Sequence, residues 1–362
     1  MITLGFLTVQ AEHEIIYATK LAKRAADFGI KIIRFCPTDI EPASLSIEGR
    51  LYDSSKDQWV IKKTELPSFI YDRCFYQNNS LSPKSRPIVQ WLKSNPNITF
   101  LGMGLPNKGE VYEAIKKHST LSAYLPPTEK IANSIQIIDY LRKQEKCVLK
   151  PLNGSGGRGI ILLELYSKKV DLTYHHGKNK QTKSFYSLKE LESFCHSLMQ
   201  KQSYLVQPLL QLKDSSGYPF DIRYLLQKNE HGKWTFKGDG VRRGYKGSFL
   251  SNLASGGEYI SYQDWAATLT PFQKVVFEDE IKTILEELPP YLDKTFPSLF
   301  ELGIDIGVSD DSCIWLLDIN SKPGRQIILK NEAHKQKDEI YEAPLKYCRY
   351  LADKQETKDI RS

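Results

Sequence analysis

A glycine-rich segment follows a lysine near the middle of the chain. Lys150-Pro151 precedes the run Gly154-Ser155-Gly156-Gly157-Arg158-Gly159. Backbone N–H groups of glycines can approach phosphate oxygens because no Cβ stands in the way, and a lysine adds a point charge. The segment therefore predicts a phosphate-binding loop, whose candidate contacts are Lys150, Gly154, Ser155, Gly156, Gly157 and Gly159.

Flanking residues separate the kinds of loop that share this GxGxxG spacing. A dinucleotide-binding loop opens a helix, but residues 160–163 are β-branched and aliphatic and predict a strand. A protein-kinase loop has its lysine downstream and is accompanied by an HRD sequence, whereas Lys150 lies upstream and the chain contains no HRD. A flexible flap between two strands remains. A plain β-turn beside a surface lysine is the alternative.

Two aspartates lie in an apolar stretch toward the C-terminus, where the pattern predicts a β-hairpin over 302–320. Asp305 belongs to the first strand and Asp318 to the second. A tight turn centred on residues 311–312 would place these two carboxylates directly opposite each other. Side chains alternate along a strand, so Asn320 shares the face of Asp318.

Opposed carboxylates destabilise a hairpin, and a divalent cation would remove the repulsion. Two carboxylates and one amide are oxygen donors that suit Mg²⁺, with phosphates and water completing its coordination. The predicted metal ligands are therefore Asp305, Asp318 and Asn320. The alternative is that one aspartate merely begins the turn toward residues 322–324.

The apolar patterns around these segments predict alternating strands and helices. Residues 2–9 and 30–35 predict strands on either side of a helix over 13–28, so the chain opens with a βαβ unit and a small α/β domain. A hairpin-like stretch is expected at 46–60. Further strands are expected at 69–73, 147–150, 160–163, 204–206, 221–226 and 234–242, and helices at 88–93, 108–115, 134–142, 188–198, 272–288 and 344–353.

Composition narrows the class of protein. The 362 residues are 41% hydrophobic, and no apolar run approaches the roughly 18 residues that span a bilayer. The N-terminus lacks a basic region and a cleavage site, which predicts that no signal peptide is present and that the protein resides inside the cell. Six cysteines without a CxxC pair indicate reduced, structural thiols.

The net charge of +7 suits an anionic ligand as well as a lysine-rich surface. Lysines cluster between Lys168 and Lys201, with aromatic residues among them. Because no nucleic-acid recognition motif accompanies the cluster, we interpret it as a solvated hairpin. We expect neither a nucleic-acid partner nor a membrane partner.

The glycine flap and the carboxylate hairpin, in this order, resemble the ATP-grasp superfamily. Nearly the whole chain resembles its YheC/YheD family of endospore coat-associated proteins. The shared segments are Tyr71-Asp72-Arg73, Leu125-Pro126-Pro127-Thr128, Lys150-Pro151 with the glycine loop, Gly217 to Arg223, Val241-Arg242, Ser251-Asn252-Leu253 and Asp318-Ile319-Asn320-Ser321-Lys322-Pro323-Gly324.

The resemblance implies an α+β ATP-grasp fold, in which two α+β sub-domains enclose a nucleotide. We expect an N-terminal α/β domain over 1–100 and the ATP-grasp domain over 101–355. The sub-domain that carries the glycine loop would cover about 125–205. A frayed tail is expected at 356–362.

The resemblance also assigns roles to residues of this chain. Lys108 and Lys150 resemble the two lysines that bind phosphates, and residues 207–210 resemble the hinge around adenine. The metal ligands match Asp305, Asp318 and Asn320. The remaining assignments are Gln207, Leu209 and Leu210 at the base, Asn252 near the phosphates, and Arg223 and Arg242 as catalytic anion anchors, each arginine having a surface ion pair as its alternative.

The implied activity is that of an Mg-ATP-dependent carboxylate–amine, or related, ligase that acts through an acyl phosphate. Two positions depart from the pattern. Asp318 stands where the superfamily usually has Glu, and Gly303 stands where many ligases carry an arginine that stabilises the acyl phosphate. Arg223 or Arg242 could substitute from a neighbouring strand. A non-catalytic spore-coat protein of the same fold and a phosphotransferase acting on a hydroxyl are the alternatives.

The expected partners are ATP, an unidentified carboxylate substrate and spore-coat proteins. Arg73 and the positive net charge suggest an anionic substrate, such as an acidic peptide or polymer. The expected location is the cytoplasm of the forespore or mother cell, or the spore coat.

Overall fold

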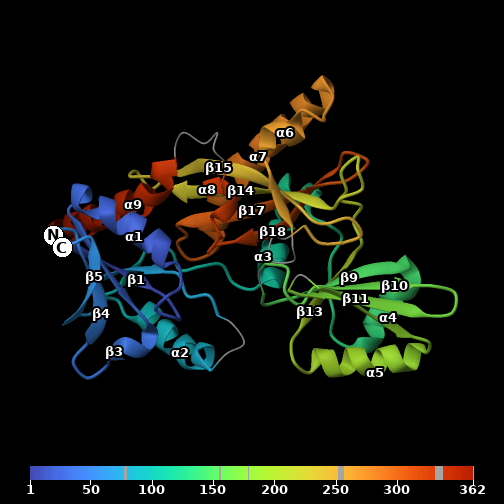
Figure 1. Ribbon diagram of the computed structural model, residues 1–362, viewed down its shortest axis with the longest axis horizontal. Coiled ribbons are helices and arrows are strands. Elements are labelled where there is room, and N and C mark those ends of the chain that lie inside the picture. The colour runs from blue at the N-terminus through green and yellow to red at the C-terminus, as the bar shows by residue number, and fades with distance from the viewer. Residues whose placement is uncertain (77–79, 155, 178, 252–256, 331–336, 362) are drawn as a thin grey trace.

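The computed structural model describes residues 1–362 except 77–79, 155, 178, 252–256, 331–336 and 362. Ser155 and Asn252, two of the predicted ligand contacts, lie outside the described residues. The described chain forms three β-sheets, which Figure 1 shows as three separate groups of strands surrounded by helices. No helix in this part of the chain is long and apolar enough to cross a membrane.

The first sheet contains the predicted βαβ unit. β1 (Ile2–Leu7) lies between β2 (Ile30–Phe35) and β6 (Phe69–Asp72), and the three strands are parallel. α1 (Ile15–Ala25) begins after the predicted His13 because Glu14 has a left-handed backbone, with φ of 52°. The remaining elements of this part are β3 (Ile40–Glu41), β4 (Ser46–Asp53), β5 (Gln58–Glu65), α2 (Leu81–Ser94) and β7 (Thr99–Phe100).

The second sheet carries the glycine-rich segment. Its strands are β8 (Glu129–Lys130), β9 (Lys146–Pro151), β10 (Ile161–Leu165), β11 (Val170–His176), β12 (Asn179–Phe185) and β13 (Tyr204–Pro208). α4 (Ser134–Gln144) and α5 (Leu188–Met199) cover one face of this sheet (Figure 1). β9 and β10 are antiparallel neighbours, so the glycine loop joins two strands as the sequence predicts.

The lysine-rich stretch forms the β11–β12 hairpin and α5 of this second sheet. Nearly all side chains of β12 are exposed to solvent, and the buried exception is Phe185. The predicted exposed hairpin is therefore present, and it is followed by the helix α5.

The third sheet has the order β16-β15-β14-β17-β18. Its strands are β14 (Phe220–Lys228), β15 (Trp234–Arg243), β16 (Glu258–Ile260), β17 (Glu301–Val308) and β18 (Ile314–Asn320). The helices around it are α3 (Lys108–Ile115), α6 (Tyr262–Ala266), α7 (Pro271–Thr295) and α8 (Gln326–Lys330).

Alternation along β14 and β17 gives the third sheet two different faces. Ile222, Tyr224 and Ile304 belong to the apolar core that includes α3 and α7. Arg223 and Asp305 alternate with them and project from the opposite face. Packing of the apolar face therefore directs the charged side chains toward the second sheet.

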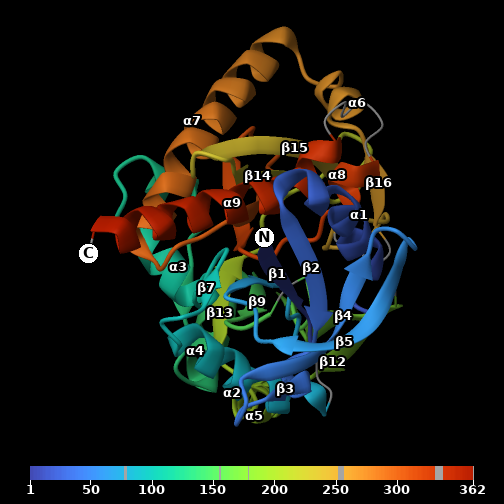
Figure 2. The same ribbon diagram turned by 90° about the vertical axis from the view of Figure 1, so that its left-hand side faces the viewer.

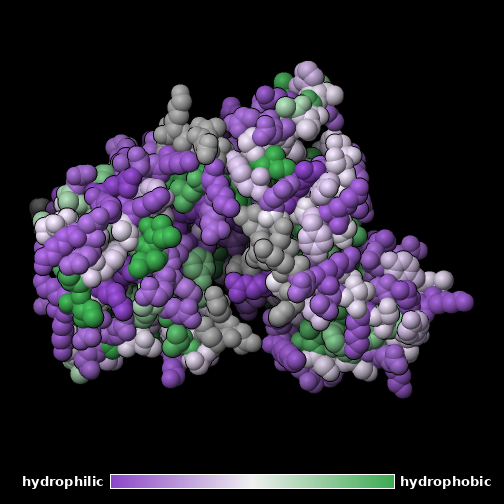
Figure 3. Space-filling model, in the orientation of Figure 1, coloured by the Kyte–Doolittle hydropathy of each residue, from purple (hydrophilic) through white to green (hydrophobic). Residues whose placement is uncertain are grey.

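A long C-terminal helix joins the first and third sheets. α9 (Lys337–Arg361) lies beside α1 (Figure 2). The ring of Tyr341 contacts that of Tyr17, with a centroid distance of 5.2 Å. Both helices share one apolar core with β1 and with Leu225 of β14. The helix extends beyond Asp353, where the sequence predicts it to end, and occupies positions 356–361 of the predicted tail. Figure 3 shows the surface hollowed between the first-sheet part and the rest, with hydrophilic residues around the hollow.

Candidate active site

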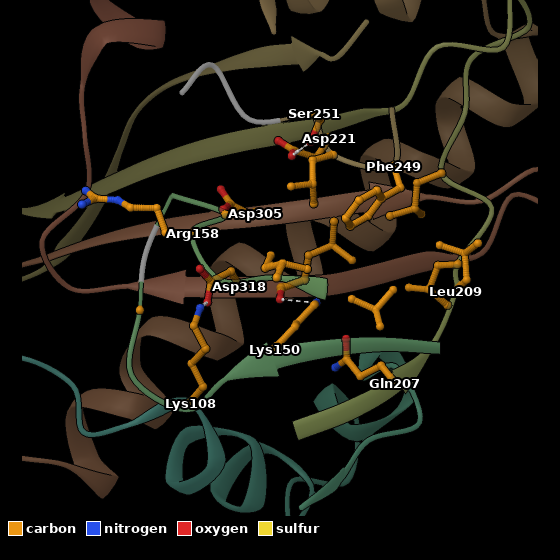
Figure 4. A pocket seen from close by; sticks show the side chains of 18 of the residues that line it. Lys108, Lys150, Arg158, Gln207, Leu209, Asp221, Phe249, Ser251, Asp305 and Asp318 are labelled. Carbon is orange, nitrogen blue, oxygen red and sulfur yellow. Dashed lines mark hydrogen bonds and ion pairs between the residues drawn. The ribbon is translucent and has the colours of Figure 1, made fainter. Parts of the chain in front are cut away.

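A cavity lies between the second and third sheets (Figure 4). Its volume is about 870 Å³ when the solvent-filled space at its entrance is included. One end is apolar, where Leu209 and Phe249 lie away from Lys108 and Asp318 (Figure 4), and the apolar lining also includes Val148, Leu210, Leu212 and Leu317. The other end is charged. It brings together the predicted residues Lys108, Lys150, Gly154, Gly157, Arg242, Asp305 and Asp318.

The glycine loop covers the charged end of the cavity. Gly156, Gly157 and Gly159 have φ of 66°, 75° and 74°, a backbone region that L side chains rarely adopt. Arg158, which is not among the predicted contacts of the loop, also lines the cavity. The loop geometry thus explains the glycines without requiring a helix at this position.

Lys150 reaches the cavity from β9 and donates a hydrogen bond to the carbonyl oxygen of Leu317 over 3.5 Å. Burial lowers the pKa of Lys150 to about 8, and the neighbouring ammonium of Lys108 contributes. Lys108 is the first residue of α3, where Asn107 caps the helix by accepting hydrogen bonds from two backbone N–H groups. Its ammonium forms an ion pair with Asp318. The two predicted phosphate lysines therefore meet at one end of the cavity.

The β17–β18 register pairs Asp305 with Asp318, which confirms the predicted opposition. The turn is centred on Asp311, whereas the sequence predicts a centre between residues 311 and 312. The backbone N–H of Ser309 donates to the carbonyl oxygen of Cys313 across it. A β-bulge between Asp305 and Ile306 restores the expected pairing.

Cationic side chains surround the two opposed carboxylates. Arg223 donates to Asp305 with Nε and, over 3.0 Å, with Nη2, and Nη2 of Arg242 lies 2.8 Å from the same carboxylate. Although burial acts to raise the pKa of Asp305, the guanidinium of Arg223 and then that of Arg242 lower it to about 2. Both arginines are buried, so neither forms the surface ion pair considered from the sequence.

Asp221 and Ser251, which are not among the predicted site residues, complete this charged end. Asp221 accepts hydrogen bonds from Nε of Arg242 and from the hydroxyl of Ser251. Burial, opposed by Arg242 and reinforced by Asp305, raises the pKa of Asp221. Because Asp221 precedes Arg223 by two positions on β14, strand alternation could have identified it.

The oxygen donors at the charged end fit a hard divalent cation. Asn320 donates from Nδ2 to Asp318 over 3.1 Å, which leaves its amide oxygen available beside that carboxylate. Within the described residues, no group of three His, Cys, Asp or Glu side chains is arranged to hold a metal. A metal at Asp305 and Asp318 would therefore need Asn320 and nucleotide oxygens as further ligands.

Arg73 does not bind an anionic substrate, contrary to the suggestion from the sequence. It is fully buried and donates to Glu14, to Glu301 over 2.6 Å and to the carbonyl oxygen of Pro323 over 2.9 Å. Lys322 pairs with buried Asp72 over 2.6 Å. The segment 71–73 thus holds the loop that follows Asn320.

Comparison with known proteins gives two kinds of match. The YheC/D-like ATP-grasp family matches residues 97–351. The chain is 44% identical to the endospore coat-associated protein YheC of Bacillus subtilis strain 168 over 99% of both chains. It is 26% identical to the endospore coat-associated protein YheD of the same organism, over 85% of this chain and 68% of YheD.

Several solved structures share the fold. D-cycloserine synthetase DcsG is similar with a TM-score of 0.55 and 10% identity, over 97% of this chain and 99% of that one. D-alanyl-alanine synthetase A from Vibrio cholerae is similar with a TM-score of 0.54 and 11% identity, over 97% of this chain and 99% of that one. The ATP-grasp ligase PsnB is similar with a TM-score of 0.52 and 11% identity, over 96% of this chain and 100% of PsnB. Likeness at these identities concerns the fold alone and confirms the predicted α+β ATP-grasp fold.

Proposed function

The chain belongs to the YheC/D-like ATP-grasp family, and we propose that it binds Mg-ATP and joins a carboxylate to an amine or a related nucleophile. The observation that carries the proposal is the cavity with one apolar end and one charged end. The apolar end suits a nucleobase. The charged end combines lysines, arginines and opposed carboxylates, as phosphoryl transfer requires.

The proposed reaction has two steps. A carboxylate oxygen attacks the γ-phosphorus of ATP, the bond to the β–γ bridging oxygen breaks, and ADP leaves with that electron pair. The nucleophile then adds to the carbonyl carbon of the acyl phosphate, and the adduct collapses with loss of phosphate. The nucleophile's proton passes to solvent. No covalent nucleophile on the protein is needed, since the chain acts by positioning and by charge.

Each charged residue has a proposed role in this reaction. Lys108 and Lys150 bind phosphate oxygens as point charges. Arg223 and Arg242 position Asp305 and present guanidinium groups to the charge that develops on the transferring phosphoryl group. Mg²⁺ would be held at Asp305 and Asp318, with Asn320 beside them, and when bound it neutralises phosphate charge.

Calorimetric titration of ATP tests the site. We expect Mg²⁺-dependent binding to the wild type and loss of that binding in Asp318→Ala. Asp310→Ala is the matched control, because Asp310 is an exposed aspartate in the turn of the same hairpin. Absence of ATP binding to the folded wild type would contradict the proposal.

A second experiment separates the chemical alternatives. A panel of acids incubated with the protein, Mg-ATP and hydroxylamine should give a hydroxamate if an acyl phosphate forms. Phosphorylation of a hydroxyl without hydroxamate would favour phosphotransfer. ATP binding without product from any acid or amine would favour a non-catalytic coat protein.

Coat association is proposed from the relatives, which are described as endospore coat-associated proteins. Immunodetection in fractions of purified spores tests it: enrichment in the coat extract is expected, and confinement to the soluble core fraction would contradict it.

A further inference from the structure

The segment Leu125-Pro126-Pro127-Thr128 meets Gln207 beside the apolar end of the cavity. β8 and β13 are antiparallel, with Glu129 opposite Val206, so Thr128 lies next to Gln207 where β8 begins. Nε2 of Gln207 donates to Oγ1 of Thr128 over 2.6 Å. The hydroxyl of Thr128 donates in turn to the carbonyl oxygen of Pro126 over 2.7 Å.

The structure gives this chain of hydrogen bonds one direction. The hydroxyl of Thr128 has a single proton and donates it to the carbonyl oxygen of Pro126, which also accepts from the hydroxyl of Tyr112 over 3.2 Å. Oγ1 of Thr128 can then only accept from Gln207, which requires the NH₂ side of the amide to face it. The amide oxygen is therefore turned the other way, and Figure 4 shows it directed into the cavity.

The surroundings make this oxygen selective. Gln207 is 6% exposed and lines the cavity together with Leu209 and Leu210. A base in this end would meet a buried acceptor whose orientation is fixed from behind. A 6-amino group can donate to that oxygen, whereas a 6-keto oxygen would face it as a second acceptor and leave both unsatisfied.

We propose that Thr128, by orienting the amide of Gln207, makes the site select a purine with a 6-amino group over one with a 6-keto group. Thr128 is a positioning residue, because it acts through Gln207. The inference rests on the proposed function, in that the cavity must bind a nucleoside triphosphate. It gives Pro126 a role as well, since its carbonyl oxygen is the final acceptor.

ATP and ITP provide the test, because ITP replaces the 6-amino group with a 6-keto group and keeps the ribose and triphosphate. We expect the full-length wild type to bind Mg-ATP at least about tenfold more tightly than Mg-ITP. Thr128→Val keeps the branched shape but removes the hydroxyl, so it should lower this preference by about tenfold. Thr128→Ser keeps the hydroxyl and should retain the preference.

Two results would overturn the inference: equal affinity of the wild type for ATP and ITP, or an undiminished preference in Thr128→Val. In either case Mg-ATP binding would still stand, so the proposed function would survive. Failure of the wild type to bind both nucleotides would remove the basis of both proposals. If Thr128→Val does not fold, Gln207→Met replaces it in the test. Methionine has a side chain of similar length without the acceptor oxygen, so this variant must also lower the preference for ATP over ITP.

Discussion

The guanidinium of Arg223 occupies the space that a side chain at Gly303 would need. A Cβ added to Gly303 would lie 2.8 Å from Nη1 of Arg223 and 3.3 Å from its Cζ. Gly303 also stands where many ATP-grasp ligases carry an arginine, two residues before the first metal aspartate. In this chain Arg223 of the adjacent strand β14 lies directly opposite Asp305. The missing side chain at 303 makes room for it.

Gly303→Ala should lower the free energy of unfolding by roughly 1–3 kcal/mol, as overpacking of a well-packed site does. The added methyl would also lie 2.5 Å from Cβ of Pro323, so neither neighbour can move away freely. Urea denaturation measures the change. Gly324→Ala is the control, because nothing lies within 4 Å of a Cβ there. Equal midpoints for the two variants would contradict the steric argument.

Lys108→Met should strengthen the binding of Mn²⁺ in the absence of nucleotide. The ammonium of Lys108 pairs with Asp318, so removing it leaves a carboxylate free for a cation. We expect an increase in Mn²⁺ affinity of about tenfold, together with weaker ATP binding. Electron paramagnetic resonance of free Mn²⁺ measures the first, and calorimetry the second. Lys116→Met, an exposed lysine at the end of the same helix, should change neither. Weaker Mn²⁺ binding in Lys108→Met would argue against Asp318 as a ligand.

ATP affinity should fall as the pH rises above about 8. Burial and the neighbouring Lys108 lower the pKa of Lys150 from 10.5 to about 8, so its positive charge is lost above that pH. The loss in affinity should approach tenfold per pH unit at most, since one proton is linked to binding. Lys150→Met should bind weakly with a flatter pH profile. Lys146→Met, on the same strand, should keep the wild-type slope. A flat profile in the wild type would contradict the role given to Lys150.

The same pKa has the opposite effect on the stability of the free protein. Between about pH 8 and 10.5 the unfolded chain holds a proton on Lys150 that the folded chain has lost. The contribution of Lys150 to the free energy of unfolding therefore rises with pH across this window. Denaturation of the wild type and Lys150→Met at pH 7.5 and 10 measures it, and the stability advantage of the variant should shrink at the higher pH.

Glu301→Gln should cost roughly 3–5 kcal/mol of stability, because it leaves buried cations without a counter-charge. Glu301 is 2% exposed and accepts hydrogen bonds from Arg73 and Arg325, with distances of 2.6 and 2.7 Å. Chemical denaturation tests this. Asp139→Asn breaks an exposed pair with Arg142 and should cost no more than about 1 kcal/mol. Similar losses in both variants would mean that the buried network contributes little.

The spacing of residues along the sequence was sufficient to predict the strands that carry the candidate site. The alternation of β18 places Asp318 and Asn320 on one face, and closure of the hairpin brings Asp305 opposite. The sequence did not predict the exact position of the turn. A three-residue loop with a bulge and a two-residue turn can both place Asp305 opposite Asp318. Likewise, the aliphatic residues after Gly159 predicted a strand, and β10 begins at Ile161.

The partners of these side chains could not be predicted in the same way. The ion pair of Lys108 with Asp318 joins positions 210 residues apart, and that of Arg73 with Glu301 joins positions 228 apart. Arg73 illustrates the difference: its charge suggested an anionic ligand, but the third sheet supplies a buried carboxylate instead.

The sequence by itself determined the local structure of the candidate site: a glycine loop between two strands after a lysine, and two aspartates opposed across a hairpin. Both follow from glycine conformation and from the period of a strand, which act over a few residues. The tertiary structure alone decided which cations neutralise Asp305, which way the amide of Gln207 points, and that Arg73 is unavailable to a ligand. These depend on packing between sheets, because burial makes each polar group pair with whatever the fold brings beside it.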